Sequence, residues 1–281
     1  MQSPPTLTDL HALARNRARA LRSRDPAMFL QQEAADEVKE RLTLVNRTFI
    51  APAIVTPFPQ IWANVVDGAK IVADDDVLSL ENGAHDLVIH GMSLHWANDP
   101  VGQLVQSRRA LRPDGMFLGA LFGGQTLAEL RAALAEAESR FTGGLSPRVA
   151  PMAEIRDLGG LLQRAGFALP VADSATQTVT YATALHLMRD LRLMGEANAM
   201  TARNRAPLSR AVLAETIQRY ADGFGADERV TATFEMIFLT GWAPDESQQK
   251  PLRPGSASAR LADALGTDET PVSDPARPGR V

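Results

Sequence analysis

Side chains that could take part in acid–base chemistry or bind a ligand follow one apolar run of the sequence. His90, Met92 and Ser93 stand at the end of that run, and His95 and Trp96 come soon after it. In open α/β sheets ligands bind where the strands end, and a histidine at such a place is a candidate acid, base or ligand. The alternatives are a hydrogen-bonded core position for the first histidine and a core-covering position for the tryptophan.

Acidic, glycine and arginine residues elsewhere in the chain could complete the same crevice. An acidic triplet follows the second expected strand, a glycine pair follows the strand after the histidines, and one arginine lies in a loop rich in glycine and proline. That arginine would suit an anionic or carboxylate partner. A solvated loop explains the acids equally well, and a turn before a helix is the favoured interpretation of the glycines. The residues concerned are Asp74, Asp75, Asp76, Gly123, Gly124 and Arg148.

The residue inventory excludes several other chemistries. The chain has no cysteine, which removes disulfides, thiol nucleophiles and cysteine-bound zinc. Its 5 histidines lack the short repeated spacing of a zinc motif, so we predict no metal site. The sequence also contains no phosphate-binding loop, no serine-hydrolase elbow and no zinc-protease motif.

The composition is typical of a globular protein, with 45% hydrophobic and 22% charged residues. A net charge of −4, from 29 basic and 33 acidic residues, argues against nucleic-acid binding. No apolar run approaches the roughly 20 residues that span a bilayer. The arginine-rich segment 12–24 has features of a transit peptide, but a basic first helix is the favoured interpretation.

The elements expected around the histidines alternate between strand and helix. The apolar run 86–92 is typical of a buried parallel strand. Asp99, followed by proline, predicts the start of a helix. A second strand over 116–121 is followed by Thr126 and Glu129 at the spacing of a capping box. This alternation predicts a parallel α/β sheet with right-handed crossovers.

Further elements follow from the same patterns, and the last strand is expected to be antiparallel. The proline-rich C-terminal segment cannot build a packed core and is expected to be disordered. The other expected strands are 49–55, 69–72, 178–181 and 229–239, and the later helices are 184–194 and 208–224. The expected divisions are N-terminal helices over 1–46, an α/β domain over 47–243 with a helical insertion at 184–224, and the tail 244–281.

Several fragments in a fixed order carry a family resemblance that runs from about residue 13 to residue 243. They are HWANDP, LRPDG, FGGQTLAELR, GGLSPRVAPM, RDLGGLLQRAGFALP and LTGWAP. The chain resembles the family of the mitochondrial complex I (NADH dehydrogenase) assembly factor five, whose bacterial relatives are grouped with the malonyl-carrier-protein methyltransferase of biotin synthesis. The resemblance implies a Rossmann-like class I methyltransferase fold, S-adenosylmethionine as cofactor, and a protein partner that is an NADH dehydrogenase subunit.

On this resemblance the candidate residues divide into two groups. Those expected at the cofactor are Asp74, Asp75, His90, Met92 and Ser93, and those expected at a partner pocket are His95, Trp96, Gly123, Gly124 and Arg148. The strand ends at 72, 92 and 121 are expected to lie side by side. The resemblance identifies no catalytic residue.

The segment that should grip the cofactor departs from the family pattern. Members carry a glycine-rich loop after the first strand, because the backbone must approach the ligand closely. Here residues 51–59 contain no glycine, and Pro57 and Pro59 remove two backbone donors. The linker 56–68 has room for a single crossover, so one strand–helix unit and the acid that holds the ribose are expected to be missing. The nucleotide half of the fold is therefore predicted to be truncated.

Two functions remain open from the sequence. As an enzyme, the chain would use S-adenosylmethionine to modify a protein partner in complex I assembly, by methyl transfer or by the arginine hydroxylation attributed to the mitochondrial member. As a non-catalytic protein, it would keep the scaffold and act in assembly or binding without the glycine-rich loop. Its expected location is the cytoplasm, peripheral to the inner membrane.

Overall fold

The computed structural model describes residues 6–249 and residue 266. The chain divides into two compact units, residues 1–246 and 247–281, and the elements below all belong to the first unit. Most of the expected tail 244–281 lies outside the described residues. None of the described helices is long and apolar enough to cross a membrane.

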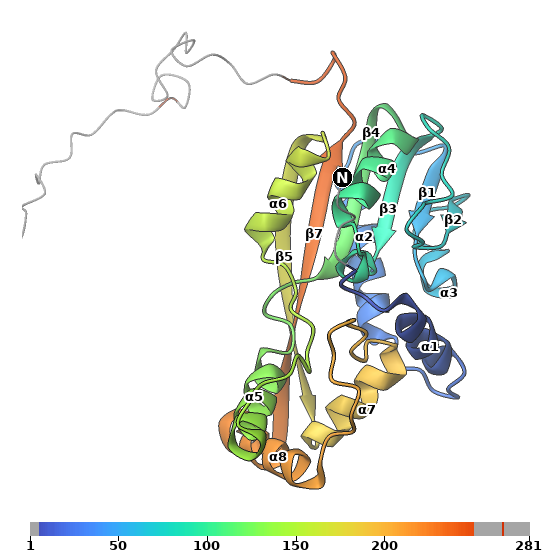
Figure 1. The fold of residues 1–281 in the computed structure, drawn as a ribbon. Helices are drawn as coiled ribbons and strands as arrows, with labels where there is room; N and C mark the ends of the chain where they lie inside the picture. Colours follow the sequence, from blue (N-terminus) through green and yellow to red (C-terminus); the bar gives the residue numbers. More distant parts are fainter. Residues whose placement is uncertain (1–5, 250–265, 267–281) are drawn as a thin grey trace, which may run out of the picture. The chain divides into compact units, whose positions relative to one another are not determined.

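Seven strands form one sheet in the order β2-β1-β3-β4-β7-β5, with β6 paired to β7. The first four are parallel, and β7 runs antiparallel to each of its partners (Figure 1). The strands are β1 Pro52–Val55, β2 Lys70–Val72, β3 His85–Gly91, β4 Leu111–Phe122, β5 Ala168–Tyr181, β6 Gly225–Ala226 and β7 Arg229–Trp242. This is the expected Rossmann-like class I methyltransferase arrangement.

Helices cover both faces of this sheet. They are α1 Leu10–Leu21, α2 Phe29–Thr43, α3 Pro59–Trp62, α4 Pro100–Ala110, α5 Ala128–Thr142, α6 Ile155–Arg164, α7 Ala184–Met194 and α8 Arg210–Phe224, with a short 3₁₀ turn at Leu94–Trp96. Helices α4 and α6 pack in the core of one face, and α2, α3 and α7 pack in the core of the other. Helices α5 and α8 pack against each other (Figure 1).

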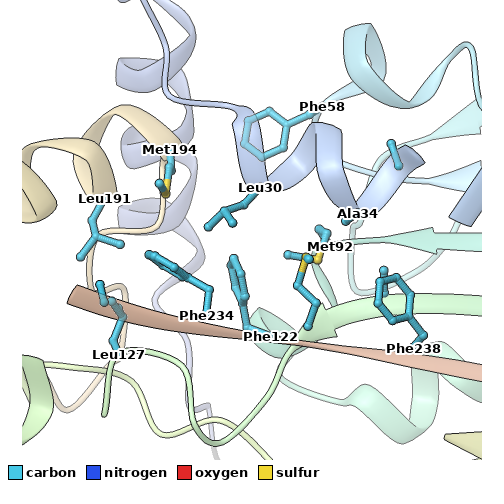
Figure 2. Packing of buried hydrophobic residues seen from close by; sticks show 14 of the residues in the cluster. Leu30, Ala34, Phe58, Met92, Phe122, Leu127, Leu191, Met194, Phe234 and Phe238 are labelled. Carbon is cyan, nitrogen blue, oxygen red and sulfur yellow. The ribbon is translucent and has the colours of Figure 1, made fainter. Parts of the chain in front are cut away.

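The alternation of side chains along the strands separates two apolar cores. Leu87 and Ile89 of β3 pack with α2 and α3, whereas Val88 between them packs with α4 and α6. Figure 2 shows the first core, in which Leu30 of α2 and Met92 lie among aromatic rings from β4 and β7. Burial on both faces explains why these strands read as continuous apolar runs.

Several predicted boundaries are confirmed, and three strands, β4, β5 and β7, are longer than predicted. Asp99 caps α4, as predicted, by accepting from Gly102 N at 2.8 Å. Strand β4 begins at Leu111, before the predicted 116–121, because Leu111 already pairs with His85. An irregular step, in which Asp114 takes φ 59°, separates that pair from the pairing of Met116 with Leu87. Strand β5 extends well before the predicted 178–181 because it pairs with β7 along nearly its whole length.

The predicted capping box before α5 is wrong. The residue that precedes the helix is Leu127, which has φ 57° and makes no side-chain cap. Thr126 Oγ1 instead donates to Glu235 O and accepts from Glu235 N, and the Glu129 carboxylate accepts from Thr233 N. Both side chains bind β7, since that strand brings backbone donors and acceptors beside the helix start.

The nucleotide half of the sheet is short, as predicted. Only the four-residue helix α3 stands between β1 and β2. However, β1 lies between β2 and β3, so the strand ends at 72, 92 and 121 do not all lie side by side as expected. The reason is that β2, after one short crossover, pairs with the free edge of β1.

Candidate functional site

Two aromatic rings lie beyond the carboxyl end of β1, at the side of the sheet where ligands of open α/β sheets bind. Phe58, shortly after β1, and Trp62, at the end of α3, are fully buried. Trp62 packs so closely on β3 that a Cβ atom at Gly91 would lie 2.6 Å from its ring. Its Nε1 donates to Oε1 of Gln31 on α2 at 3.0 Å, which ties the ring to the helix layer.

The residues at this edge do not fit a cradle for a nucleoside cofactor. Such a cradle needs backbone that approaches the ligand and commonly takes positive φ. The segment 56–59 contains no glycine, and none of its residues has positive φ. What remains is a cavity of about 270 Å³, called here the crevice cavity. Ordinary small-molecule sites enclose roughly 300–1,000 Å³, so the crevice cavity is small for a nucleoside.

Helix α1 lies over the crevice cavity and binds its acidic wall. Arg17 Nη1 donates to Oδ1 and Oδ2 of Asp74 at 3.1 and 2.9 Å, and the two side chains are only 13% and 14% exposed. Gly195 lets the turn after α7 approach α1 closely, since a Cβ there would lie 3.1 Å from the Arg17 Cα. Asp75 and Ser93 also line the cavity. The carboxylate expected at the cofactor is thus held by the chain's own guanidinium.

His90 is part of a buried hydrogen-bond chain behind the crevice cavity. Its Nε2 lies 2.7 Å from Gln103 Oε1, and the Gln103 amide donates to Asp75 O at 3.1 Å. Because the amide nitrogen is used in that way, His90 Nε2 carries the hydrogen, and Nδ1 accepts from Ser93 Oγ at 3.4 Å. Burial lowers the pKa of His90 below its ordinary value, despite opposing effects of Gln103 and the Asp74 charge.

The lowered pKa of His90 predicts a loss of stability on acidification. Below the ordinary value of 6.5 the unfolded chain takes up a proton at His90 while the folded chain does not. The free energy of unfolding should therefore fall as pH drops below about 6.5, by at most about 1.4 kcal/mol per pH unit. Urea unfolding of His90→Gln between pH 7.5 and 5 should show a smaller slope. The exposed His11→Gln serves as control, and equal slopes in both variants would contradict the prediction.

Besides His90 and His95, three of the predicted residues line neither this cavity nor the one described next. Met92 is fully buried in the apolar core with φ 50° (Figure 2). At Gly123 a Cβ would lie 2.5 Å from Glu235 Oε2, and at Gly124 it would meet the carboxylate of Glu154. The glycines therefore permit the close approach of two carboxylates, in agreement with the favoured interpretation of a tight turn.

A second cavity, of about 320 Å³, lies between α5, α7, the loop 148–152 and the segment 196–208. It is called here the Glu196 cavity. Trp96 and Arg148, both expected at a partner pocket, line it together with Glu196. His95 reaches it indirectly, because its Nε2 lies 3.3 Å from Glu196 Oε2. The two cavities share Trp96 as a lining residue.

Glu196 is placed by the turn that ends α7. Gly195 takes φ 83°, and the Glu196 N–H donates back to Leu191 O at 3.0 Å, which directs the chain inward. The side chain is 7% exposed, and its Oε2 accepts from Trp96 Nε1 at 2.7 Å. Oε1 is buried and has no hydrogen-bond partner among the described residues.

The carboxyl group of Glu196 is ionised in this setting. Burial alone would raise its pKa, but the hydrogen bond and charge of His95, with the charge of Arg17 and the Trp96 hydrogen bond, lower the pKa below its ordinary value. A buried anion with one unpaired oxygen is energetically unfavourable, so it is a strong acceptor for any donor that reaches it.

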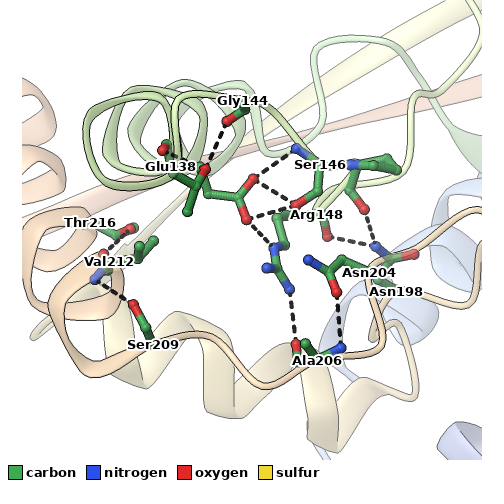
Figure 3. Close-up of polar contacts among 12 residues, drawn as sticks. Glu138, Gly144, Ser146, Arg148, Asn198, Asn204, Ala206, Ser209, Val212 and Thr216 are labelled. Atoms are coloured by element: carbon green, nitrogen blue, oxygen red, sulfur yellow. Dashed lines mark hydrogen bonds and ion pairs between the residues drawn. The ribbon is translucent and has the colours of Figure 1, made fainter.

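The loop that covers the Glu196 cavity is held by a second buried carboxylate. Glu138 of α5 accepts from Ser146 N at 2.9 Å and from Arg148 Nε at 2.6 Å (Figure 3). The Asn198 side chain donates to Pro147 O and Arg148 O, which ties the loop to the segment after α7. Arg148 is thus a structural link across the cavity whose charge is already paired.

Comparison with known proteins identifies the relatives of this chain. No protein-family model matches it. It is 40% identical over 221 residues to arginine-hydroxylase NDUFAF5, mitochondrial, of Danio rerio, which covers 78% of this chain and 68% of that protein. The chain belongs to the NDUFAF5 family.

Other relatives of this NDUFAF5-family chain are either less identical in sequence or matched over a smaller part of each chain. The NDUFAF5 of Dictyostelium discoideum is 40% identical over 195 residues, 69% of this chain and 45% of that protein. Malonyl-[acyl-carrier protein] O-methyltransferase of Laribacter hongkongensis is 33% identical over 187 residues, 66% of this chain and 61% of that protein. The chain spans about half to two thirds of the length of these curated relatives.

Among solved structures, phosphoethanolamine N-methyltransferase 2 of Haemonchus contortus, with phosphomonomethylethanolamine and S-adenosylhomocysteine, is similar to this NDUFAF5-family chain with a TM-score of 0.43. The match is 12% identical and covers 75% of this chain and 53% of that one.

Sequence reasoning missed the two charged residues that organise the cavities of this NDUFAF5-family chain. Arg17 reads as one of five arginines in a basic helix, and Glu196 follows a helix without any motif. The one available signal was Gly195, a helix-ending glycine that predicts an inward turn of the chain.

Proposed function

We propose that this chain is a non-catalytic member of the NDUFAF5 family. In this proposal it binds an NADH dehydrogenase subunit during complex I assembly, in the cytoplasm at the periphery of the inner membrane. The observation that carries the proposal is the occupation of the crevice by the chain itself, through Phe58, Trp62 and the Arg17–Asp74 ion pair. Binding of S-adenosylmethionine should then be weak or absent, because no glycine loop receives it and the crevice cavity is small.

The names of the relatives support a partner that presents arginine. The curated NDUFAF5 proteins of Danio rerio and Dictyostelium discoideum are named arginine-hydroxylases. We infer that the partner of this chain offers an arginine side chain, which the chain recognises without modifying it.

An S-adenosylmethionine-dependent enzyme is the second candidate. It is favoured by Asp74, Asp75 and Ser93, which line the crevice cavity where the family resemblance implies the cofactor. Such a function requires Arg17 to leave Asp74 and α1 to move away from the strand ends, so cofactor binding would have to offset the loss of a largely buried ion pair.

Calorimetric titration with S-adenosylmethionine separates the two candidates. We expect no saturable binding below millimolar concentration, which corresponds to about −4 kcal/mol and is within reach of a few remaining contacts. The Laribacter hongkongensis methyltransferase serves as the control for the titration. A micromolar dissociation constant for this chain, or a methylated product on a partner protein, would contradict the proposal.

The partner is tested separately by cross-linking the full chain in its host cells and identifying the co-purified proteins by mass spectrometry. We expect NADH dehydrogenase subunits to be enriched over a control in which an unrelated protein carries the same tag. Recovery of no such subunit would contradict the assembly role.

A further inference from the structure

Helix α1 presents a row of arginines to solvent. Arg15, Arg19 and Arg22 follow one another at spacings of four and three, which places them on one side of the helix. Arg24 comes shortly after the helix, and all four side chains belong to exposed residues. Arg17 points elsewhere, because it lines the crevice cavity and pairs with its acidic wall. The four exposed residues are called here the arginine face.

The charge of the arginine face is not neutralised by the described residues, none of which forms an ion pair with it. The chain has no acidic residue between Asp9 and Asp25. Asp9 is already paired with Arg203, and Asp25, which follows Arg24, balances at most one of the four charges. Because the whole chain carries a net charge of −4, this face is a local excess of positive charge. Such an excess attracts an anionic partner and orients it.

An open hollow of about 1270 Å³ adjoins the arginine face and shares Arg15 with it. The formal charges of its arginine and aspartate residues cancel, with three of each among the described lining residues. The hollow therefore contributes shape and neutral polar groups, such as the exposed Thr201 and Asn204. Its volume exceeds the roughly 300–1,000 Å³ of small-molecule sites, so a segment of polypeptide fits it better than a small molecule.

A charged row beside a hollow favours a protein segment over other anionic partners. A bilayer surface is broad and flat, so it would pass over the hollow without filling it. A nucleic acid is repelled by the net negative charge of the rest of the chain. A protein segment can place carboxylates against the guanidinium groups, which bind them through two parallel hydrogen bonds, and can lay its backbone in the hollow.

Contacts within the chain hold α1 in place before any partner arrives. Asp9 caps the helix by accepting from Ala12 N at 3.0 Å, and Asn16 Nδ2 donates to Ala197 O at 2.8 Å. The ion pair of Arg17 with the crevice wall is a third such contact. A partner therefore meets a preformed helix, and little backbone ordering opposes its binding.

We propose that the arginine face and the adjoining hollow form the docking surface for an acidic segment of the protein partner. The inference rests on the proposed function for the existence of that partner, and it names the surface and the charge that the partner presents. It requires no chemistry and no cofactor. A partner bound there lies beside the crevice cavity, because Leu10 and Asp76 line both the hollow and that cavity.

The first test uses the full chain and fluorescently labelled hexaglutamate, with binding followed by fluorescence anisotropy. Hexaglutamine serves as the control of equal length without charge. We expect saturable binding of hexaglutamate alone, weakened at least tenfold between about 50 and about 300 mM sodium chloride, because salt screens exposed charges. Sedimentation with phosphatidylcholine vesicles, with and without phosphatidylglycerol, tests the bilayer alternative, and a labelled single-stranded oligonucleotide tests the nucleic-acid alternative.

Variants connect the binding to this surface. A triple arginine variant of α1 should weaken hexaglutamate binding at least tenfold, whereas a control variant that loses the same charge from exposed arginines outside α1 should leave the affinity unchanged. The triple variant is Arg15→Gln, Arg19→Gln and Arg22→Gln, and the control is Arg112→Gln, Arg156→Gln and Arg164→Gln. Thr201→Trp, which narrows the hollow and keeps every charge, should also weaken binding. If the triple variant does not fold, Arg22→Glu alone reverses one charge of the face and still decides the question.

Co-purification after cross-linking connects the surface to the partner. We expect NADH dehydrogenase subunits to be recovered with the unaltered chain and with the control variant, and to be lost from the triple variant. Equal recovery with all three chains would place docking on another surface and overturn the inference alone.

Other outcomes would overturn the inference as well. They are equal binding of hexaglutamate and hexaglutamine, unchanged peptide affinity in the triple variant, and binding to phosphatidylglycerol vesicles or to the oligonucleotide that the triple variant loses. Failure of the proposed function has a different signature. In that case no NADH dehydrogenase subunit is recovered with the unaltered chain, while hexaglutamate binding still depends on the arginine face and supports an acidic segment of another protein.

Discussion

Replacing Trp62 by alanine is expected to lower the free energy of unfolding by about 3–5 kcal/mol. The ring is fully buried between Gly91 and α2, so its removal leaves a cavity that the rigid ends of β1 and β3 cannot fill. The change also leaves the buried Gln31 amide without its partner. Urea unfolding monitored by circular dichroism measures the loss, provided that the slope with denaturant is unchanged.

Two variants serve as controls for the role of Trp62. Trp242→Ala removes a partly exposed tryptophan and should lose less stability than Trp62→Ala. Trp62→Phe keeps much of the ring and should lose less as well. We also expect Trp62→Ala not to bind S-adenosylmethionine, because space alone does not supply the missing glycine loop. A loss below about 1 kcal/mol would show that the ring does not close the crevice as described.

The substitution Asp74→Asn is expected to lower the free energy of unfolding by about 2–4 kcal/mol. It leaves the largely buried Arg17 guanidinium without its ion-pair partner, and breaking a fully buried pair in this way costs about 3–5 kcal/mol. Because the two side chains are 13% and 14% exposed, the expected loss is slightly smaller than for a fully buried pair. Hydrogen exchange should show that the amides of α1 lose protection more than those of the sheet, because the ion pair holds this helix.

The control for this prediction lies in the same acidic triplet. Asp76 is exposed and makes no ion pair with any described residue, so Asp76→Asn should change stability by no more than about 0.5 kcal/mol. A double-mutant cycle with Arg17→Gln isolates the coupling between the two side chains. Equal effects of Asp74→Asn and Asp76→Asn, or a coupling near zero, would contradict the view that α1 is held on the crevice by charge.

Much of the fold could be predicted from short-range patterns. The apolar run 86–92 became β3, the helix 184–194 has the predicted bounds, and Asp99 caps its helix as expected. The capping box before α5 failed because Thr126 and Glu129 found partners on β7, more than a hundred positions away in the chain. Local propensity is reliable only where no distant strand competes for the same polar groups.

The candidate site was predictable in part. Trp96 and Arg148 do line one cavity and Asp74, Asp75 and Ser93 line another, but the glycine pair lines neither. The ion pair of Arg17 with Asp74 joins residues 57 positions apart, and the contact of His95 with Glu196 joins residues 101 positions apart. No spacing rule applies over such separations.

The sequence by itself determined the parallel α/β scaffold, the family, and the absence of glycine after the first strand, because each depends on residue types and spacings within short segments. Only the tertiary structure decided what replaces the missing loop: two aromatic rings at the strand ends and an arginine from the first helix. It also decided that Glu196 turns inward to meet Trp96 and His95. Those contacts depend on how helices α1 and α7 pack on the sheet, which is set by the summed burial of many side chains rather than by any local pattern.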